Sequence, residues 1–377
     1  MASSFTTTVP AGTTVTVRII DSTSRITKLP FKALMGPSMP GLDDMPALPT
    51  WSFLIEHASG RKLLFDLGIP VDWQDTAPVV ANRLKTNGWD IQVEKPTTEI
   101  LEAGGVKPED VEAIVWSHWH WDHIGNPSYF PPSTKVIVGP GFKDELLPAY
   151  PTGPKSNVRE SDFAGRTLQE ITFKESNTLN IGPFEALDYF HDGSFYLLNT
   201  PGHATGHLAG LARTTTSPST FIFMGGDLTH HSGELRPSPH LPLPESIPSS
   251  QLPSLCQALS YTSVCPGAIF EALQTFEGRS REPARTTPFF DPAMGKDIPT
   301  AIETIKKTME ADADENVLYI FAHDAKVREV VKGNFFPGTV NAWKEKGWRD
   351  ALLWRFLEDF EEAARRVKQG EGKGGKL

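Results

Sequence analysis

Cysteine is scarce in this chain of 377 residues, in which Cys256 and Cys265 are the only two. Two cysteines cannot form a disulfide framework, and they do not supply the paired CxxC motifs of a structural zinc site. Long hydrophobic runs are also missing, because no stretch approaches the roughly 18 apolar residues that span a membrane. We therefore expect a protein without a membrane partner, with both thiols buried or partly buried in its core.

Targeting signals are equally hard to find. The segment from Met1 to Phe5 has neither the basic start nor the apolar stretch of a secretory signal peptide. The chain ends in Gly375-Lys376-Leu377, which differs from the peroxisomal Ser-Lys-Leu signal by having Gly in place of Ser. We expect a cytoplasmic protein, and the ending leaves peroxisomal import open.

Positive charge is also in short supply. Lysine and arginine together number 36 against 46 aspartates and glutamates, which gives a formal net charge of −10 at pH 7. This balance argues against a protein that binds nucleic acid by neutralising phosphates, and against a membrane-surface binder with a basic face. Because 39% of residues are hydrophobic and 22% are charged, the composition predicts a soluble globular protein.

The chain does contain a series of short apolar runs, many of which end at a glycine or a polar residue. Such runs predict strands, and longer segments with helical periodicity predict helices. We expect an α/β protein in which residues 1–377 form a single domain. The predicted strands lie at 14–20, 51–58, 62–67, 113–116, 135–138, 195–198, 220–224 and 317–321, and the predicted helices at 96–103, about 300–311 and about 350–367.

Two regions differ in composition from the rest. Residues 232–300 are rich in proline and serine, and we expect them to be an insertion over the core, not an independent domain. Proline-rich loops of this length often serve as lids or binding loops. The last residues, at about 369–377, are rich in glycine and lysine and are expected to be disordered.

The most informative segment is Ser117-His118-Trp119-His120-Trp121-Asp122-His123, which directly follows a predicted buried strand. His118 and His120 point the same way on an extended strand end, because side chains repeat every two residues. Asp122 and His123 lie where the chain turns, so they can face a second point, and one segment can then serve two metal ions. Trp119 and Trp121 are expected to pack beneath this site and not to contact substrate.

Three more potential ligands follow predicted strands, namely His203, Asp227 and His323. In an α/β layer architecture such strand ends gather along one edge of the sheets, where binding sites form. Together with the 118–123 cluster, these positions supply five histidines and two carboxylates. That number fills two metal sites, and its mainly imidazole ligation suits zinc best.

These segments resemble the motifs of the metallo-β-lactamase superfamily. Residues 118–123 match its HxHxDH signature, and residues 200–207, Thr-Pro-Gly-His-Ala-Thr-Gly-His, match its third motif. Asp66 matches an early aspartate at a strand end, Gly226-Asp227 the bridging aspartate, and Ala322-His323-Asp324 the last histidine. The matches are in the family's order and cover most of the chain. The overall pattern is similar to that of a fungal-type lactonase and lactamase branch, and to acyl-homoserine lactonases.

The resemblance implies an αββα sandwich of two mixed β-sheets with outer helices and a site at one edge of the sheets. It also implies two Zn²⁺ ions per chain, with Fe or Mn as possible replacements. Asp227 would bridge the two ions, and His207 and Asp66 would orient ligands without binding metal. The first ion would be bound by His118, His120 and His203, and the second by Asp122, His123 and His323.

One position departs from the lactonase pattern. Bacterial acyl-homoserine lactonases that this chain resembles commonly carry a tyrosine three residues after the bridging aspartate, where it contacts the substrate carbonyl. Here that position is His230, which is followed by His231. Either could donate a hydrogen bond or a proton in its place, since imidazole titrates near neutrality, or both could simply shape the pocket wall.

The resemblance implies a hydrolase that opens a small cyclic ester (lactone) or a cyclic amide or carbamate (lactam). Two zinc ions about 3.5 Å apart would hold a bridging hydroxide that attacks the carbonyl. Asp122 would orient this nucleophile and relay its proton, and His230 or His231 would protonate the leaving group. The alternative is a thioesterase acting on an acyl-carrier or glutathione thioester. A nuclease is disfavoured by the acidic balance, and a non-catalytic binding module by the complete ligand set. The oligomeric state cannot be predicted.

Overall fold

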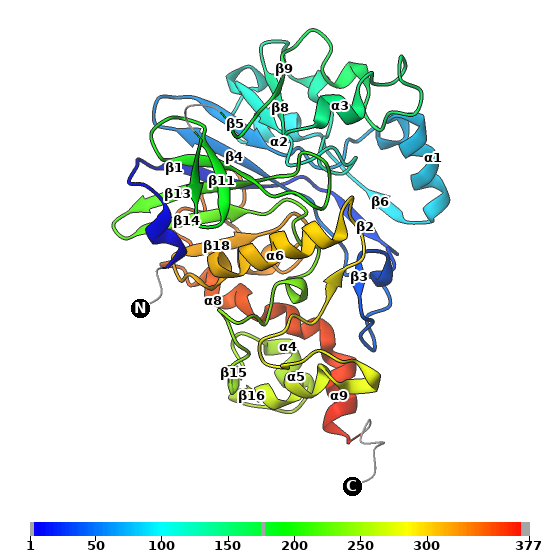
Figure 1. The fold of residues 1–377 in the computed structure, drawn as a ribbon, viewed down its shortest axis with the longest axis vertical. Helices are drawn as coiled ribbons and strands as arrows, with labels where there is room; N and C mark the ends of the chain where they lie inside the picture. Colours follow the sequence, from blue (N-terminus) through cyan, green and yellow to red (C-terminus); the bar gives the residue numbers. More distant parts are fainter. Residues whose placement is uncertain (1–3, 175–177, 371–377) are drawn as a thin grey trace.

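Two six-stranded β-sheets, packed face to face, form the centre of the computed structural model, which describes residues 4–174 and 178–370 (Figure 1). Strands β5, β7, β8 and β9 of the first sheet run parallel to one another, as do β14 and β18 of the second, and the other neighbours are antiparallel. In spatial order, the first sheet contains β1 (Val15–Asp21), β4 (Trp51–His57), β5 (Lys62–Phe65), β7 (Ala113–Val115), β8 (Lys135–Val138) and β9 (Leu168–Glu170). The second contains β10 (Thr178–Ile181), β11 (Phe184–Asp188), β12 (Phe195–Asn199), β13 (Leu208–Thr216), β14 (Ser219–Met224) and β18 (Val317–Ile320).

Helices cover the outer face of each sheet, which explains why the central strands are apolar on both sides. Leu197 and Ile222 point between the sheets, whereas their neighbours Tyr196 and Phe223 point outward and join a cluster with α6 (Ile298–Ala313). In the first sheet, Ile114 points outward into a cluster that includes residues of α2 (Thr97–Ala103) and α3 (Phe142–Leu146). The predicted αββα sandwich of two mixed sheets is therefore confirmed.

A second hydrophobic cluster lies below the sandwich in Figure 1. Its insertion residues come from the antiparallel pair β15 (Ser246–Pro248) and β16 (Val264–Pro266), from α4 (Pro253–Ala258), which connects these two strands, from α5 (Gly267–Leu273), and from the segment that follows. They pack against the C-terminal elements α8 (Trp348–Leu353), the 3-10 segment η9 (Arg355–Phe360) and α9 (Glu361–Lys368). Of residues 232–300, only Met294 lines the cavity described below. Most of this segment forms one side of this second core, and a role as a lid over the cavity stays a prediction.

The single helix predicted at about 350–367 is broken into three pieces. Trp354, with φ −111° and ψ 5°, ends α8, and the tighter η9 precedes α9. In a 3-10 helix, residues three apart lie above one another. Trp354, Leu357 and Phe360 have this spacing, and all three are buried in the second core. Packing against the insertion therefore favours the tighter turn here.

The remaining elements are short and lie at the edges of the sandwich. They are α1 (Pro78–Asn87), α7 (Val327–Val330), the pair β2 (Arg25–Thr27) with β6 (Asp90–Gln92), and the pair β3 (Met35–Gly36) with β17 (Asp291–Pro292). Within the described residues, no helix combines the length and apolar character needed to cross a membrane. Cys256 and Cys265 are free and buried, as expected. Most of the tail predicted to be disordered, including Gly375-Lys376-Leu377, lies outside the described residues.

A buried ion pair joins the beginning of the insertion to the end of α6. The Arg236 guanidinium donates from Nε to Asp312 Oδ2 at 2.8 Å and from Nη1 to the carbonyl of Leu353 at 2.7 Å. Both charged side chains are almost fully buried. The pair therefore ties the sandwich to the segments that form the second core.

We predict that Asp312→Ala lowers the free energy of unfolding by about 3–5 kcal/mol, because it leaves the Arg236 charge buried and unpaired. Urea denaturation followed by circular dichroism measures this change. As a control, Glu303→Ala on the same helix removes an exposed carboxylate that pairs only with Lys306 and should change stability little. Similar stabilities for the two variants would contradict the role given to the buried pair.

Candidate metal centre

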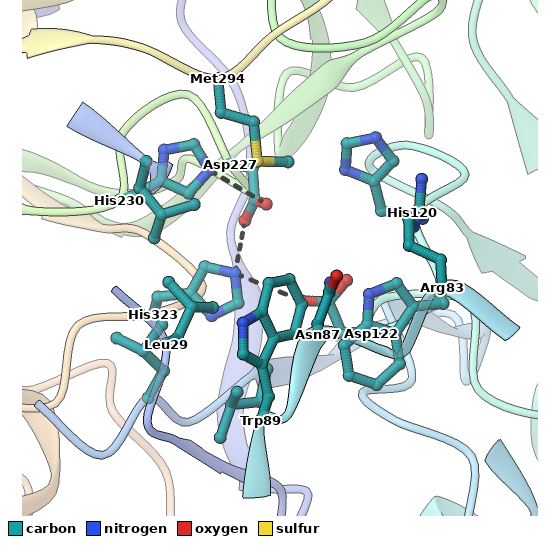
Figure 2. Close-up of a pocket in the computed structure, with 14 residues that line it drawn as sticks. Leu29, Arg83, Asn87, Trp89, His120, Asp122, Asp227, His230, Met294 and His323 are labelled. Atoms are coloured by element: carbon teal, nitrogen blue, oxygen red, sulfur yellow. Dashed lines mark ion pairs between the residues drawn. The ribbon is translucent and has the colours of Figure 1, made fainter. Parts of the chain in front are cut away.

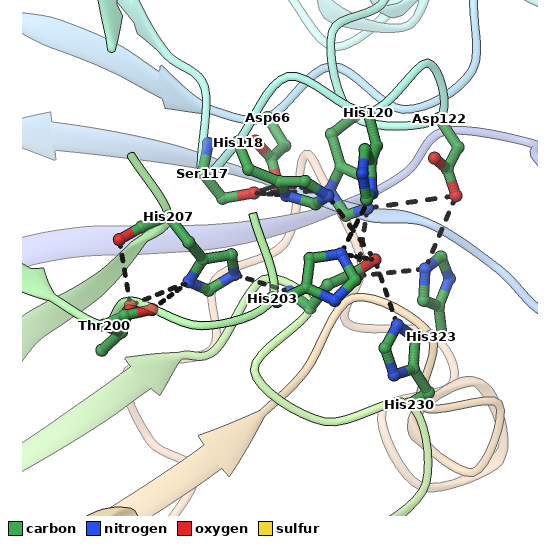
Figure 3. A network of polar contacts seen from close by, with 12 residues as sticks. Asp66, Ser117, His118, His120, Asp122, Thr200, His203, His207, His230 and His323 are labelled. Carbon is green, nitrogen blue, oxygen red and sulfur yellow. Dashed lines mark hydrogen bonds and ion pairs between the residues drawn. The ribbon is translucent and has the colours of Figure 1, made fainter. Parts of the chain in front are cut away.

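Five loops, each leaving the carboxyl end of a strand, meet at one edge of the two sheets (Figure 3). The parallel pairs β5–β7 and β14–β18 bring their carboxyl ends to the same edge. Each loop carries residues that were singled out from the sequence. They are Asp66 after β5, residues 117–123 after β7, residues 200–207 after β12, Asp227 and His230 after β14, and His323 after β18.

The loops place seven potential ligands in two groups. The first contains His118, His120, His203 and Asp227, and the second contains Asp122, His123 and His323. In each group, one ligand atom of every member lies within 4.8 Å of the others. The two groups have the composition expected from the sequence.

Asp227 lies between the groups and turns one oxygen toward each. Its Oδ1 is 3.0 Å from His123 Nε2 and 3.1 Å from His323 Nε2 in the second group. Its Oδ2 is 3.4 Å from His203 Nε2 and 3.7 Å from His118 Nε2 in the first. This is the arrangement in which one carboxylate can bridge two cations.

Hydrogen bonds behind the imidazoles aim their free nitrogens at the centre. His123 Nδ1 donates to Asp66 Oδ2 at 2.8 Å, and His323 Nδ1 donates to the carbonyl of Pro49 at 2.7 Å. The Ser117 hydroxyl donates to Asp66 and is then free to accept from His118 Nδ1 at 3.0 Å. Since Nδ1 makes these hydrogen bonds in all three rings, each Nε2 faces the centre, where it can offer a lone pair to a cation.

His207 supports the centre from behind. Its Nδ1 donates to the carbonyl of Thr200 at 3.0 Å, and its Nε2 accepts from the backbone N–H of Asp227 at 3.1 Å. His207 and Asp66 therefore orient other residues and do not belong to either group of potential ligands.

Several acceptors at the centre have no hydrogen-bond partner, including the buried atoms His118 Nε2, His123 Nε2 and Asp227 Oδ1. Buried polar atoms are otherwise almost always bonded. Unbonded ring nitrogens and a carboxylate oxygen that converge on the same space are what a cation would satisfy. The donor set of imidazoles and carboxylates fits zinc, so the residues suit the cofactor that the sequence implied.

The charges within the centre shift the pKa values of its members. Burial lowers the pKa of His118, His120 and His203, that of His120 to about 3, so these rings are neutral. Burial also disfavours charge on His123 and His323, but Asp227 and the other carboxylates nearby outweigh it and raise their pKa. Burial likewise raises the pKa of Asp227, but the neighbouring His123 and His323 lower it by more. A bound cation would take the place of these protons.

The adjacent residues His230 and His231 point to different places. His230 is almost fully buried, has no hydrogen-bond partner on either ring nitrogen, and places Nε2 3.5 Å from Asp227 Oδ2. The His231 ring turns away from the two groups, with Nε2 3.2 Å from Asp359 Oδ2 and its face stacked on Phe360. The structure thus brings His230 to the centre and places His231 in the second core.

A cavity of about 250 Å³ opens over the two groups (Figure 2). His120, Asp122, Asp227, His230 and His323 line its floor. Its walls are mainly apolar and consist of Ile26, Leu29, Leu34, Leu48, Trp89, Trp121 and Met294, with Arg83 and Asn87 of α1 as the polar exceptions.

The sequence patterns did not indicate two features of this cavity. Trp121 packs in the second core, as expected of a large aromatic residue, but it also lines the cavity. The wall residues before residue 90 were not recognised, because they lie in a loop region and on a short helix without any ligand motif nearby. A periodic pattern marks which residues are buried, but it does not show which of them border a cavity.

Comparison with known proteins identifies relatives. A family model described as the metallo-beta-lactamase superfamily matches residues 45–213. The chain is 40% identical over 356 residues to gamma-lactamase FDB1 of Fusarium pseudograminearum, which covers 92% of this chain and 83% of the relative. It is also 40% identical over 367 residues to cytochrome P450 monooxygenase mpaDE of Penicillium roqueforti, where it covers 95% of this chain but only 39% of that longer protein.

A solved structure shares the fold. It is a B. thuringiensis AiiA mutant with N-decanoyl-L-homoserine bound at the active site, with a TM-score of 0.54 and 19% sequence identity. The match covers 87% of this chain and 99% of that chain. At this identity the likeness concerns the fold alone.

We predict that Asp66→Asn weakens zinc binding about 10- to 100-fold, the usual effect of losing the partner that orients a ligand. The amide cannot accept all the hydrogen bonds that the carboxylate accepts from Ser117 and His123. The orientation of the His123 ring is therefore no longer fixed. Competition with a chromophoric chelator measures the affinity. Asp75→Asn, which changes an exposed carboxylate in the loop before α1, is the control. An unchanged affinity in Asp66→Asn would show that this support is dispensable.

Proposed function

This chain belongs to the metallo-β-lactamase superfamily and is a metallo-hydrolase of the lactamase and lactonase type, and from that premise we propose that it opens small cyclic amides or esters with two divalent metal ions. Zinc is the metal that the imidazole-rich donor set favours, with iron or manganese as the alternatives. The substrate is a small molecule that carries a lactam, cyclic carbamate or lactone ring.

The observation that carries this proposal is the position of Asp227 between the two groups. A single carboxylate with one oxygen toward each group supports two cations at the short separation of dinuclear hydrolases. When bound, the two cations supply a water molecule of lowered pKa and polarise the carbonyl group under attack. The groups around Asp227 then determine where protons move.

Asp122 is the residue that we assign to orient the attacking water. Its Oδ2 is 3.6 Å from His323 Nε2, and its side chain lines the cavity floor. A carboxylate at the floor can accept a proton from the attacking water and pass it toward the leaving group.

His230 is the residue that we assign to protonate the leaving group. It lines the cavity, and neither of its ring nitrogens has a hydrogen-bond partner within the described chain. The backbone N–H of His230 donates to Glu234 Oε2 at 2.6 Å, which holds the turn that directs the ring toward Asp227. His231 was the other candidate from the sequence, and its pairing with Asp359 favours a structural role.

The size of the cavity supports a small ring substrate. About 250 Å³ is just below the usual range for small-molecule pockets, and the walls are mainly apolar. The name of the 40% identical relative, gamma-lactamase FDB1, supports a five-membered cyclic amide as the first substrate to test. A thioesterase acting on a carrier-bound acyl chain would need a longer channel, and thioesters therefore serve as the counter-test.

We predict metal-dependent turnover of lactams, cyclic carbamates or lactones, and none of acyl thioesters, when proton release is measured with zinc-loaded and chelated protein. His120→Ala should lower kcat/KM by more than about a hundredfold and reduce bound zinc while the fold is kept, because it removes a potential ligand. His240→Ala, which changes an exposed histidine, is the matched control. Full activity and metal content in His120→Ala, or turnover of thioesters alone, would refute the proposal.

We predict different effects from substitutions of the two adjacent histidines. His230→Ala should lower kcat about 10²-fold or more, with a larger effect on lactams than on lactones, because an amine leaves only after protonation. His231→Ala should instead lower the melting temperature and leave kcat close to that of the parent, since it removes one of the two partners of Asp359 and the ring that stacks on Phe360. Steady-state kinetics and thermal unfolding measure the two effects. A reversed pattern would transfer the proton-donor role to His231.

A further inference from the structure

The polar side of the cavity comes from one helix. Arg83 and Asn87 lie four residues apart on α1, so they project from the same face of that helix, and both line the cavity. The residues of α1 that are buried, Val80, Ala81 and Leu84, lie on the adjacent face of the helix. Figure 2 shows Arg83 beside His120, and the Arg83 charge is one of those that act on that ring.

Arg83 differs from every other arginine in the described chain. The other guanidinium groups each pair with a carboxylate or a backbone carbonyl. Among the residues that the structure describes, the Arg83 guanidinium and the Asn87 side-chain amide make no hydrogen bond or ion pair, although the Arg83 carbonyl accepts from the Thr86 hydroxyl. Exposure alone does not account for this, because exposed arginines elsewhere in the chain are paired.

The surroundings of Arg83 favour a ligand as its missing partner. Seven apolar side chains form the remainder of the wall, and the nearby acidic groups Asp122 and Asp227 lie at the metal centre. A substrate that places its ring carbonyl at the floor therefore extends along apolar surface toward one unpaired cation. A guanidinium binds carboxylate and phenolate oxygens with paired hydrogen bonds, and loss of water from the filled cavity strengthens the contact.

We propose that Arg83, assisted by Asn87, determines substrate specificity by binding an anionic oxygen, a carboxylate or a phenolate, on an apolar ring system at the side of the cavity that α1 forms. This inference rests on the proposed function, because it assigns a substrate class to that same site. The apolar walls accept the ring body, the metal centre accepts the carbonyl, and α1 selects the substituent. Arg83 is therefore a specificity residue and is not part of the hydrolytic machinery.

The test uses matched substrates, namely a benzo-fused γ-lactam or γ-lactone that carries a carboxylate on the benzene ring, and its uncharged methyl ester. The zinc-loaded parent should hydrolyse the carboxylate at least about tenfold faster in kcat/KM. Arg83→Met keeps the unbranched apolar stem of the side chain without the charged guanidinium and should remove this preference, mainly through KM. Arg83→Lys should restore part of it, because the ammonium keeps the charge but not the paired geometry.

Lys85→Met is the control, because it removes one positive charge from an exposed residue of the same helix that does not line the cavity. It should leave the preference unchanged. An equal loss of activity on both substrates in Arg83→Met, or no preference in the parent, would overturn the inference while leaving the proposed function intact.

Binding measured by calorimetry provides a readout that does not depend on turnover. A carbocyclic analogue of the carboxylated compound, in which CH2 replaces the ring nitrogen or oxygen so that no bond can be hydrolysed, should bind to zinc-loaded parent at least about tenfold more tightly than to Arg83→Met, and equal affinities would overturn the inference. Failure of every ring substrate to turn over would instead refute the proposed function, and the two failures are therefore distinguishable.

Discussion

The buried carboxylate of Asp227 is the interaction on which the rest of the site depends. A carboxylate removed from water is costly unless opposite charge or hydrogen bonds surround it. Here it faces imidazoles on both sides, with His123 and His323 at about 3 Å from one oxygen and His203 at 3.4 Å from the other. Those rings come from loops of both sheets, so the sandwich must hold all of these strand ends in register before the charge is compensated. The metal centre is thus a property of the whole sandwich and not of one motif.

Local patterns in the sequence were sufficient to predict an α/β protein and the positions of the potential metal ligands, whereas the αββα sandwich was predicted from the resemblance to a known family. A buried strand is an apolar run, and a ligand at its carboxyl end is the next polar residue, as with Asp227 after β14 and His323 after β18. The supports behind the ligands were only partly accessible. Asp66 and His207 lie within motifs, whereas the carbonyl of Pro49, which accepts from His323 at 2.7 Å, has no signature because any residue carries a carbonyl.

Contacts between distant segments were the part that the sequence could not provide. The proline-rich composition of residues 232–300 predicted a loop, but it did not show that Phe270 and Phe289 pack with Phe360 and Phe31 in one cluster. The sequence likewise could not show which of His230 and His231 faces the metal centre. Their order along the chain is uninformative, whereas the extended backbone of His231, with φ −152° and ψ 141°, sends neighbouring side chains to opposite sides. One ring then faces the metal centre and the other the second core.

The residues that orient the potential metal ligands and the residues that form the wall of the cavity lie in different parts of this molecule. The supports Asp66, Ser117 and His207 lie behind the ligands, and none of them lines the cavity. The apolar walls and Arg83 come mainly from segments outside the sandwich, so substitutions there can change the pocket without moving the residues that orient the ligands. Leu48 and Pro49 are the exception. The Leu48 side chain lines the cavity while the next residue accepts the hydrogen bond of His323. Any change that shifts this loop alters the pocket and the metal centre together, and at this point selectivity and metal binding are coupled.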